Sequence, residues 1–286
     1  MGAKTIERLA KDLKKTFPDM RGFSFRNLKY MVQLVKESPD EIGQQLVAQI
    51  PWGHNIALIQ LLKDEKERLW YAQETIKNGW SRNILIHWIT SDLYRRQGKA
   101  TTNFKNTLPA PQSDLATEVI KDPYKFDFLA LREKFNEKEL EDGLLQHIQH
   151  FLLELGAGFA FVGRQYKLTV SNTDYYLDLL FYHLKLRSYV VVELKITEFK
   201  PEYVGKMNFY LSAIDDLLRH PEDRPTIGII LCKTKDNVRI EYALRDINKP
   251  IGVSGYEVQL VESLPENMKG SLPTIEELEE ELGKTT

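Results

Sequence analysis

The stretch Tyr175–Lys195, YYLDLLFYHLKLRSYVVVELK, reads as two hydrophobic strands joined by a short polar turn. Each strand carries one carboxylate within its apolar part, Asp178 in the first and Glu193 in the second. Burying a carboxylate without a partner is costly, so something must neutralise both groups. What that partner is decides what kind of site this stretch can form.

The register of this hairpin follows from its length. A tight turn centred on residues 185 and 186 places Asp178 directly opposite Glu193, on one face of the sheet. Lys195 comes two residues after Glu193, so its side chain points to the same face. The hairpin therefore predicts two carboxylates and one ammonium group gathered on one surface.

A third acid is expected from the preceding helix, predicted over residues 137–155. Glu141 falls near the middle of its apolar stripe, whereas Glu154 falls on the polar side. The rise per residue of the helix and of the next strand brings Glu141 close to Asp178 but leaves Glu154 distant. We therefore predict that Glu141 joins the cluster.

Such a cluster predicts a metal site. The three carboxylates repel one another, and one lysine offsets only part of their charge. A hard divalent cation, Mg²⁺ or Mn²⁺, supplies the rest and prefers oxygen ligands. Lys195 is then placed to orient or deprotonate a water molecule and to stabilise charge on a phosphate. The alternative is a structural salt bridge between Lys195 and a neighbouring acid, but the acids on two other segments favour the metal site.

The first 110 residues read as a helical, helix-turn-helix-like domain. The phrases GFSFRNLKYMVQLV and GWSRNILIHWI both place a glycine, an aromatic residue and a serine before an apolar-periodic helix, which is typical of two helix corners. Arg26 and Arg82 lie near these helix starts and are candidates for nucleic-acid contact. A purely structural helix bundle fits the same pattern equally well.

The remaining chain predicts one further domain. Residues 111–134 read as a linker, because the overlapping stretch 99–127 holds three prolines and shows little periodicity. Residues 135–265 alternate between helices and strands around one sheet, and residues 266–286 form an acidic tail. Strands are expected at 159–170, 175–183, 188–197, 226–232 and 255–261, and helices at 201–219 and 236–246. The predicted fold class is α+β with two domains.

Composition excludes several function classes. The 286 residues carry 39 Lys and Arg against 41 Asp and Glu, so a uniformly basic nucleic-acid coat is excluded, although residues 1–36 are locally basic. A single cysteine, Cys232, excludes an internal disulfide and a cysteine-rich zinc site. No apolar run approaches 18 residues and no secretory signal opens the chain, so no membrane contact and a cytoplasmic location are expected.

At Asp178 and Glu193-Leu194-Lys195 the sequence resembles the PD-(D/E)XK nuclease superfamily, with Leu177 in place of the proline that often precedes the aspartate. The phrases FLLELGAGFAFVGRQ, LDLLFYHLKLRSYVVVELK and FKPEYVGKMNFYLSAIDD, with GWSRNILIHWI upstream, are similar to the YhcG-type family of bacterial proteins. That resemblance implies an amino-terminal winged-helix-like domain and a carboxy-terminal restriction-endonuclease-like domain with a central mixed sheet. It also implies that Asp178 and Glu193 bind the metal and that Lys195 is the catalytic lysine.

Two further candidates follow the motif. Some nucleases of this superfamily carry Gln-x-x-x-Tyr on the next helix, and here Lys206 and Tyr210 have that spacing, with lysine in place of glutamine. Lys206 is a candidate phosphate contact, although a solvent-facing lysine and a core tyrosine fit the spacing equally well. Gln165 on the preceding strand is a weaker nucleic-acid-binding candidate.

The sequence thus predicts a Mg²⁺-dependent nuclease that hydrolyses phosphodiester bonds, favouring DNA as substrate and endonucleolytic cleavage. The helical domain would dock the nucleic acid, or a protein partner or second copy of the chain. The alternative is a non-catalytic nucleic-acid-binding or assembly module that retains a nuclease fold.

Overall fold

The structure, a computed structural model, describes residues 3–37, 45–46, 48–131 and 134–260. The chain divides into two compact units, Met1–Arg95 and Arg96–Thr286, and each is described by itself. The predicted acidic tail over 266–286 lies outside the described residues. Within the described ranges, no helix combines the length and the apolar character that a membrane span requires.

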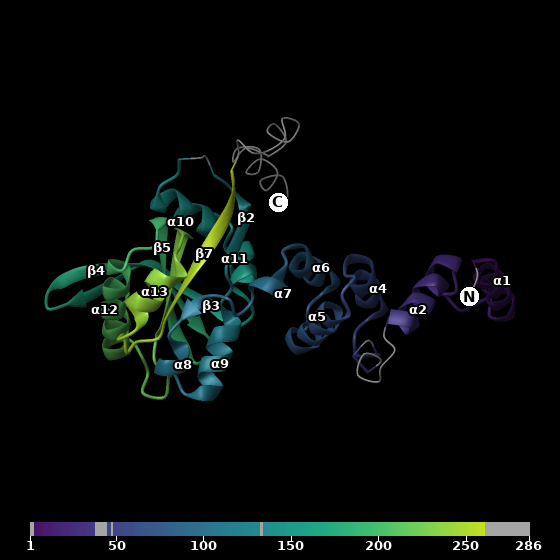
Figure 1. The fold of residues 1–286 in the computed structure, drawn as a ribbon, viewed down its shortest axis with the longest axis horizontal. Helices are drawn as coiled ribbons and strands as arrows, with labels where there is room; N and C mark the ends of the chain where they lie inside the picture. The colour runs from purple at the N-terminus through teal and green to yellow at the C-terminus, as the bar shows by residue number, and fades with distance from the viewer. Residues whose placement is uncertain (1–2, 38–44, 47, 132–133, 261–286) are drawn as a thin grey trace, which may run out of the picture. The chain divides into compact units, whose positions relative to one another are not determined.

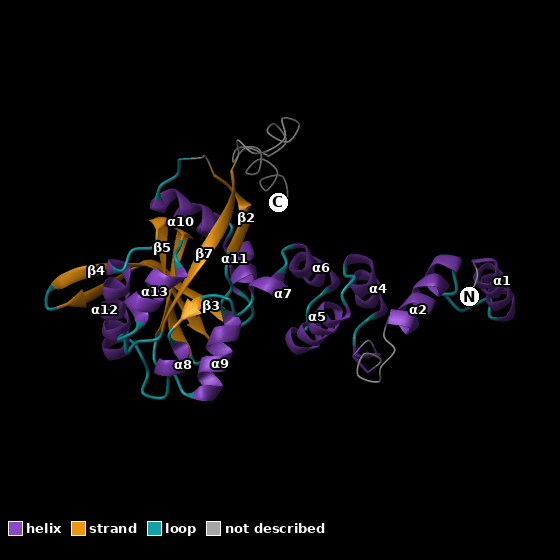
Figure 2. Cartoon of the chain, in the orientation of Figure 1, coloured by secondary structure: helices purple, strands orange, loops and turns teal. Residues whose placement is uncertain are grey.

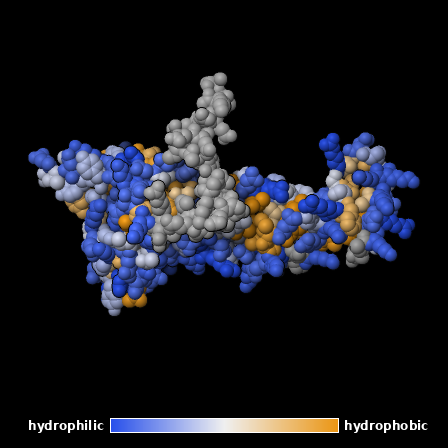
Figure 3. All heavy atoms as spheres, turned by 90° about the horizontal axis from the view of Figure 1, so that it is seen from above, coloured by the Kyte–Doolittle hydropathy of each residue, from blue (hydrophilic) through white to orange (hydrophobic). Residues whose placement is uncertain are grey.

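The first unit is helical, as predicted (Figures 1 and 2). Its described helices are α1 (Ala3–Thr16), α2 (Phe25–Glu37), α4 (Trp52–Leu61), α5 (Glu65–Asn78), α6 (Arg82–Thr90) and α7 (Leu93–Arg96), the last of which ends at the first residue of the second unit. Large apolar side chains remain exposed on these helices, including Val35 at 69% and Leu61 at 46%, and Figure 3 shows hydrophobic surface over this unit.

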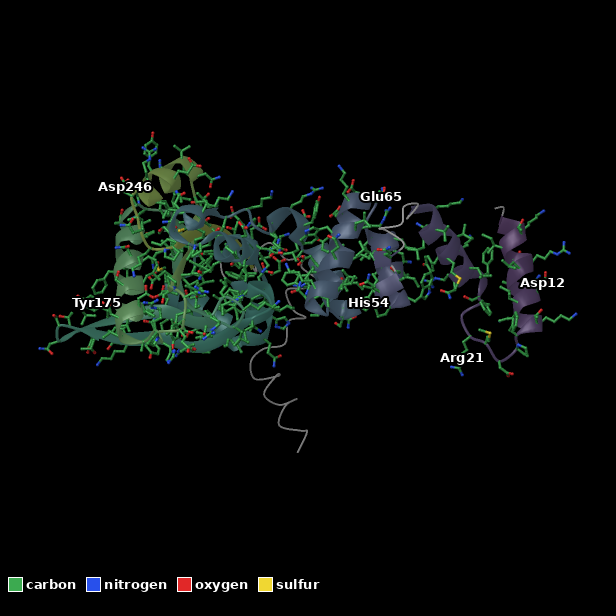
Figure 4. All side chains as sticks on the ribbon, turned by 90° about the horizontal axis from the view of Figure 1, so that it is seen from below. Asp12, Arg21, His54, Glu65, Tyr175 and Asp246 are labelled. Carbon is green, nitrogen blue, oxygen red and sulfur yellow. The ribbon has the colours of Figure 1, made fainter. Side chains whose placement is uncertain are left out.

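Both predicted helix corners are capped by their serines. The Ser24 hydroxyl accepts a hydrogen bond from the Asn27 backbone N–H, and the Ser81 hydroxyl accepts one from the Ile84 N–H. Gly79 ends α5 with a φ of 63°, a left-handed conformation that glycine adopts without a steric cost. Figure 4 labels Arg21 in the loop between α1 and α2, and His54 in α4. The Gly-aromatic-Ser phrases therefore act as helix boundaries.

The second unit is built around one mixed sheet of seven strands, with the order β1-β7-β6-β5-β4-β3 and with β2 also paired to β7. The strands are β1 (Thr101–Thr102), β2 (Tyr124–Leu131), β3 (Phe159–Val170), β4 (Thr173–His183), β5 (Ser188–Glu198), β6 (Ile227–Thr234) and β7 (Ile251–Leu260). Strands β3, β4 and β5 run antiparallel, whereas β5, β6 and β7 run parallel. The predicted mixed sheet is confirmed.

Helices cover both faces of this sheet (Figures 1 and 2). They are α8 (Phe104–Thr107), α9 (Ala110–Val119), α10 (Glu137–Gln146), α11 (Ile148–Leu155), α12 (Glu202–Leu217) and α13 (Asn237–Leu244). One core packs β2 and helices α8 to α11 against residues such as Phe181 and Val192, and the other packs α12 and α13 against residues such as Val191 and Ile230. Alternate residues of the central strands thus fill opposite cores, so these strands read as continuous apolar runs.

The description of residues 111–134 as an irregular linker is wrong. This stretch contains most of α9 and all described residues of β2, which pairs in parallel with β7. Ile120, Tyr124 and Phe126 are almost completely buried in the first core. The two prolines of this stretch fall at the starts of regular elements, since Pro111 lies in the first turn of α9 and Pro123 immediately precedes β2.

The helix predicted over 137–155 is interrupted at His147, which separates α10 from α11. The interruption changes the phase of the second half, so the placement of Glu154 on a polar face is also wrong. Glu154 is 2% exposed, and its Oε1 accepts a hydrogen bond from Arg96 Nη1 at 2.6 Å. Glu154 is therefore a buried structural partner of the first residue of this unit.

Candidate active site

The predicted register of the β4–β5 hairpin is confirmed. Leu179 pairs with Val192, and the ladder continues to His183 and Ser188. Asp178 and Glu193 are the next pair along, where the ladder stops. The Asp178 backbone N–H donates to Glu193 Oε1 at 3.3 Å, and the Leu194 N–H donates to Asp178 Oδ2 at 2.9 Å. Each carboxylate thus binds a backbone N–H of the opposite strand in place of a backbone carbonyl.

The sheet is also interrupted on the other side of Asp178. Arg164 pairs with Leu179 and Tyr166 pairs with Leu177, so Gln165 is the residue opposite Asp178. Gln165 has a φ of 41°, which places a non-glycine residue in the left-handed region. Its side-chain amide donates to Glu141 Oε2 at 2.5 Å. Outliers of this kind cluster at functional sites, and this one lies beside the predicted cluster.

Lys195 lies among three carboxylates. Its Nζ is 3.5 Å from Glu193 Oε2, 3.7 Å from Asp178 Oδ2 and 3.5 Å from Glu137 Oε2, and it also donates to the Leu194 carbonyl at 2.7 Å. The lysine side chain is only 9% exposed and that of Glu193 only 3%. Charges this poorly solvated interact more strongly than surface charges do.

The two acids of α10 approach this group from the adjacent helix. The helix begins with a capping box, in which Asn136 and Glu139 satisfy each other's backbone N–H groups. Glu141 is 6% exposed and reaches Gln165. Glu137 is half-exposed and reaches Lys195, which the sequence reasoning missed. Its position four residues before Glu141, one turn along the same helix face, is the signal that would have found it.

The next helix, α12, contributes Lys206 and Tyr210. Lys206 Nζ lies 2.9 Å from Glu193 Oε2 and 5.0 Å from the centre of the Tyr210 ring, and its side chain is 45% exposed. The Tyr210 hydroxyl donates a hydrogen bond to the Tyr176 carbonyl at 3.0 Å, and Tyr210 is buried. Lys206 therefore belongs to the cluster, whereas Tyr210 supports it from the core.

Arg26 and Arg82, the two predicted contacts on the first unit, are both exposed. The Arg26 guanidinium donates to the Tyr30 hydroxyl at 3.3 Å within α2. Their predicted contact with nucleic acid stays a prediction.

Burial and mutual repulsion set the protonation of the acids. Burial raises the pKa of Glu193, and the charge of Asp178 raises it further, against the effect of Lys206 and Lys195. Burial likewise raises the pKa of Glu141. For Lys195, burial works against the charged form, but the charges of Asp178, Glu193 and Glu137 outweigh it and raise the pKa. Lys195 is therefore an ammonium group in this arrangement.

A cavity of about 340 Å³ opens beside these residues. Its lining includes Glu137, Glu141, Asp178 and Gln165, together with the Arg164–Asp142 ion pair. All four predicted or newly found polar groups of α10, β3 and β4 thus share one space with room for a phosphate and its water molecules.

The carboxylates of this cluster fit a hard divalent cation, because each offers oxygen atoms as metal ligands. As the side chains lie, no three His, Cys, Asp or Glu residues in the described part of the chain are grouped so that they hold a metal ion. Glu193 is engaged by the two lysines and the Asp178 N–H, and Glu141 is engaged by Gln165. Metal binding would exchange these bonds for metal–oxygen bonds.

A mixed sheet covered by helices, with an aspartate on β4 and Glu-x-Lys on β5 converging at one point, defines a PD-(D/E)XK nuclease domain. A model of the YhcG PDDEXK nuclease domain matches residues 117–273, and a model of the DUF1016 N-terminal domain matches residues 1–96. The chain belongs to the YhcG family. The family, the helical amino-terminal region and the nuclease fold of the second unit, all predicted from the sequence, are thereby confirmed, whereas the helix-turn-helix-like character of the first unit stays a prediction.

The protein of Escherichia coli (strain K12) named "Putative nuclease YhcG" is 31% identical over 292 aligned positions, which cover 91% of this chain and 77% of that protein. Among solved structures, a repair endonuclease from Pyrococcus abyssi aligns with a TM-score of 0.29 at 15% identity, and an EndoMS–dsDNA complex aligns with 0.30 at 14%. These alignments cover 45% and 47% of this chain, which spans about half the length of each of the two. At these TM-scores neither likeness carries weight for fold or substrate.

Proposed function

We propose that this protein is a divalent-metal-dependent endonuclease that hydrolyses phosphodiester bonds in DNA. The observation that supports the proposal is the meeting of Asp178, Glu193 and Lys195 at an interruption of the sheet, beside a polar cavity. These are the residue types that phosphodiester hydrolysis requires, namely oxygen ligands for a cation and an ammonium group for the charge that develops on phosphate.

Asp178 and Glu193 would hold the cation, with Glu141 as a further ligand. When bound, Mg²⁺ or Mn²⁺ supplies a Lewis acid and an activated water molecule. Lys195, held as an ammonium group by its neighbours, orients that water and stabilises the negative charge on the phosphate. Gln165 positions Glu141 through their hydrogen bond.

The first prediction tests this arrangement. Lys195→Ala and Asp178→Asn should each lower the rate of DNA cleavage at least about a hundredfold, because each removes charge from the reacting centre. The assay incubates the purified full chain with plasmid, branched and single-stranded DNA and with RNA, with and without Mg²⁺ or Mn²⁺. Lys167→Ala is the matched control, since Lys167 also pairs with one aspartate, Asp174, but on the exposed end of the β3–β4 hairpin.

Wild-type protein that binds DNA but cleaves none of these substrates with either metal would instead support a non-catalytic binding module on a nuclease fold. Cleavage that survives both substitutions would reject the proposed site. Cleavage of RNA alone would reject DNA as the substrate and leave the site intact.

For the helical unit we propose nucleic-acid docking. Arg26 and Arg82 are exposed near the first turns of capped helices, a position from which arginine side chains can contact phosphate groups. The exposed apolar side chains of this unit, including Val35 and Leu61, make a protein partner or a second copy of the chain the alternative. A cytoplasmic location and the absence of a membrane partner stay predictions from the sequence.

The second prediction concerns this docking. Full-length protein with Arg26→Gln and Arg82→Gln should bind DNA of every sequence more weakly. The slope of log binding constant against log salt concentration should fall by about two, because two fewer counterions are released. Fluorescence anisotropy at several salt concentrations measures both. If that slope is unchanged and light scattering gives a mass larger than that of one chain, the helical unit would instead serve contacts with a second copy or a protein partner.

A further inference from the structure

Lys206 is the feature of the site that the proposed mechanism leaves without a task. Its Nζ lies 2.9 Å from Glu193 Oε2, a shorter distance than the 3.5 Å between Lys195 Nζ and the same oxygen. Glu193 is almost fully buried, whereas the Lys206 side chain is 45% exposed at the edge of the site. The most buried acid of the site is therefore neutralised chiefly from outside, by a residue on α12.

The charges around the site can be counted from these contacts. Four carboxylates, of Glu137, Glu141, Asp178 and Glu193, face the two ammonium groups of Lys195 and Lys206. Two further sets of charge line the cavity: the Arg164–Asp142 pair, which is balanced in itself, and Lys138, whose side chain is exposed to solvent and is left out of this count. The formal excess is two negative charges, which is the charge that one divalent cation carries. Without Lys206 the excess would be three, and one such cation would leave a negative charge uncompensated.

We propose that Lys206 is a built-in counter-ion of Glu193 that limits the site to one divalent cation per chain. The inference rests on the proposed function, since it concerns the cation of that same site. Lys206 is a positioning residue here: it acts through Glu193, holding a carboxylate oxygen that Lys195 alone would contact at the longer distance of 3.5 Å, and so keeping that oxygen from a second cation. A fixed ammonium group costs no cation from solution, so the site is complete at lower metal concentration than a site for two ions.

The geometry of α12 keeps Lys206 in this place. Pro201 precedes the helix, and Val204, Met207 and Leu211 anchor it in the second core beside β5. Lys206 Nζ lies 5.0 Å from the centre of the Tyr210 ring, and the Tyr210 hydroxyl donates a hydrogen bond to the Tyr176 carbonyl. The ammonium group thus contacts two buried residues, Glu193 and Tyr210, although its own side chain is 45% exposed, and these contacts distinguish it from a surface lysine without partners.

The test is Mn²⁺ binding to the full chain, measured by isothermal titration and by the electron paramagnetic resonance signal of free Mn²⁺. Wild-type protein should bind one Mn²⁺. Lys206→Gln should bind the first Mn²⁺ about tenfold more tightly, since a positive charge a few ångströms from the ligand is removed, or should take up a second ion. Lys206→Arg keeps the charge and should retain wild-type affinity and stoichiometry. Lys167→Gln should change neither, since Lys167 pairs with Asp174 outside the site.

The outcomes separate the two proposals. Two Mn²⁺ ions on wild-type protein, or Lys206→Gln affinity equal to or weaker than wild type, overturns the counter-ion role and leaves the proposed function standing. Wild-type protein that binds no Mn²⁺ rejects the proposed metal-dependent function and this inference with it. A thermal melt checks that the variant is folded. If Lys206→Gln is misfolded, the same comparison is made with Lys206→Met.

Discussion

Gln165 joins an unusual backbone to the chemistry of the site. Gln165 has a φ of 41° and lies opposite Asp178. Asp178 is the one residue of β4 that pairs with neither β3 nor β5. The left-handed region costs a residue with a side chain about 1 kcal/mol more than it costs glycine. The contact of its amide with Glu141 is the feature that offsets this cost.

Gln165→Gly and Gln165→Ala separate the two effects. Both remove the amide that contacts Glu141, but only glycine relieves the backbone, so Gln165→Gly should be about 1 kcal/mol more stable than Gln165→Ala. Urea unfolding of both variants measures the difference. Equal stabilities would show that the backbone at this position relaxes when the side chain is lost.

Residue-scale inference from the sequence succeeded where spacing alone fixes direction. Glu193 and Lys195 share a face because they are two residues apart on a strand, and Asp178 meets Glu193 because a short hairpin has few registers. Glu137 was missed, although it contacts Lys195, because it sits in the first helical turn, where acids usually serve the helix itself. Only the tertiary position of α10 distinguishes those two roles.

At the scale of elements, the β4–β5 hairpin closes on a buried histidine. His183 Nδ1 accepts a hydrogen bond from the Leu186 N–H, and the ring packs edge-on against Phe159. Burial, together with the charge of Lys185, lowers the pKa of His183 from 6.5 to about 4. The folded hairpin thus holds a neutral imidazole at neutral pH.

This histidine makes stability depend on pH. Between pH 6.5 and 4 the unfolded chain binds a proton that the folded chain does not, so the stability is present above pH 6.5 and is lost as the pH falls. In His183→Asn, whose side-chain oxygen can accept the Leu186 N–H, that loss should be absent. Comparing urea unfolding at pH 7 and 4.5, the variant should gain about 2–3 kcal/mol relative to wild type. If the difference in unfolding free energy between variant and wild type is the same at both pH values, His183 has the same pKa in the folded and unfolded chains.

The long strands were predictable because their apolar runs are continuous and their turns are short. The predicted 159–170 coincides with β3, and the predicted 188–197 differs from β5 by one residue. β2 escaped prediction because its burial comes from a distant partner: Tyr124 pairs with Tyr256. No local pattern reports a partner so far along the chain, and the three prolines that precede β2, Pro109, Pro111 and Pro123, made the region look irregular.

At the scale of the whole molecule, the second unit begins earlier than the sequence suggests. Arg96 is buried at 4% exposure, pairs with Glu154 and donates to the Pro123 carbonyl. Phe104 is fully buried in the first core. Residues 96–110, predicted as part of the helical domain, supply this anchoring.

A chain that starts at Arg96 should therefore fold with a single cooperative transition. A chain that starts at residue 117 leaves Glu154 buried without Arg96 and removes Phe104, so it should be less stable by at least about 3–5 kcal/mol. Circular dichroism during urea unfolding of the two chains gives the comparison. Equal midpoints would show that residues 96–116 are dispensable for this fold.

The interruption of the sheet at Asp178 has a consequence for how the centre can work repeatedly. The bonds that cross it there run between side-chain oxygens and main-chain amides, while regular pairs adjoin them, Leu179–Val192 between β4 and β5 and Glu193–Ile230 between β5 and β6. Rotating two side chains can therefore release or restore those bonds while the scaffold keeps its shape. The side chains that would bind the ion can therefore move while the backbone around them stays fixed, which suits an ion that must enter and leave.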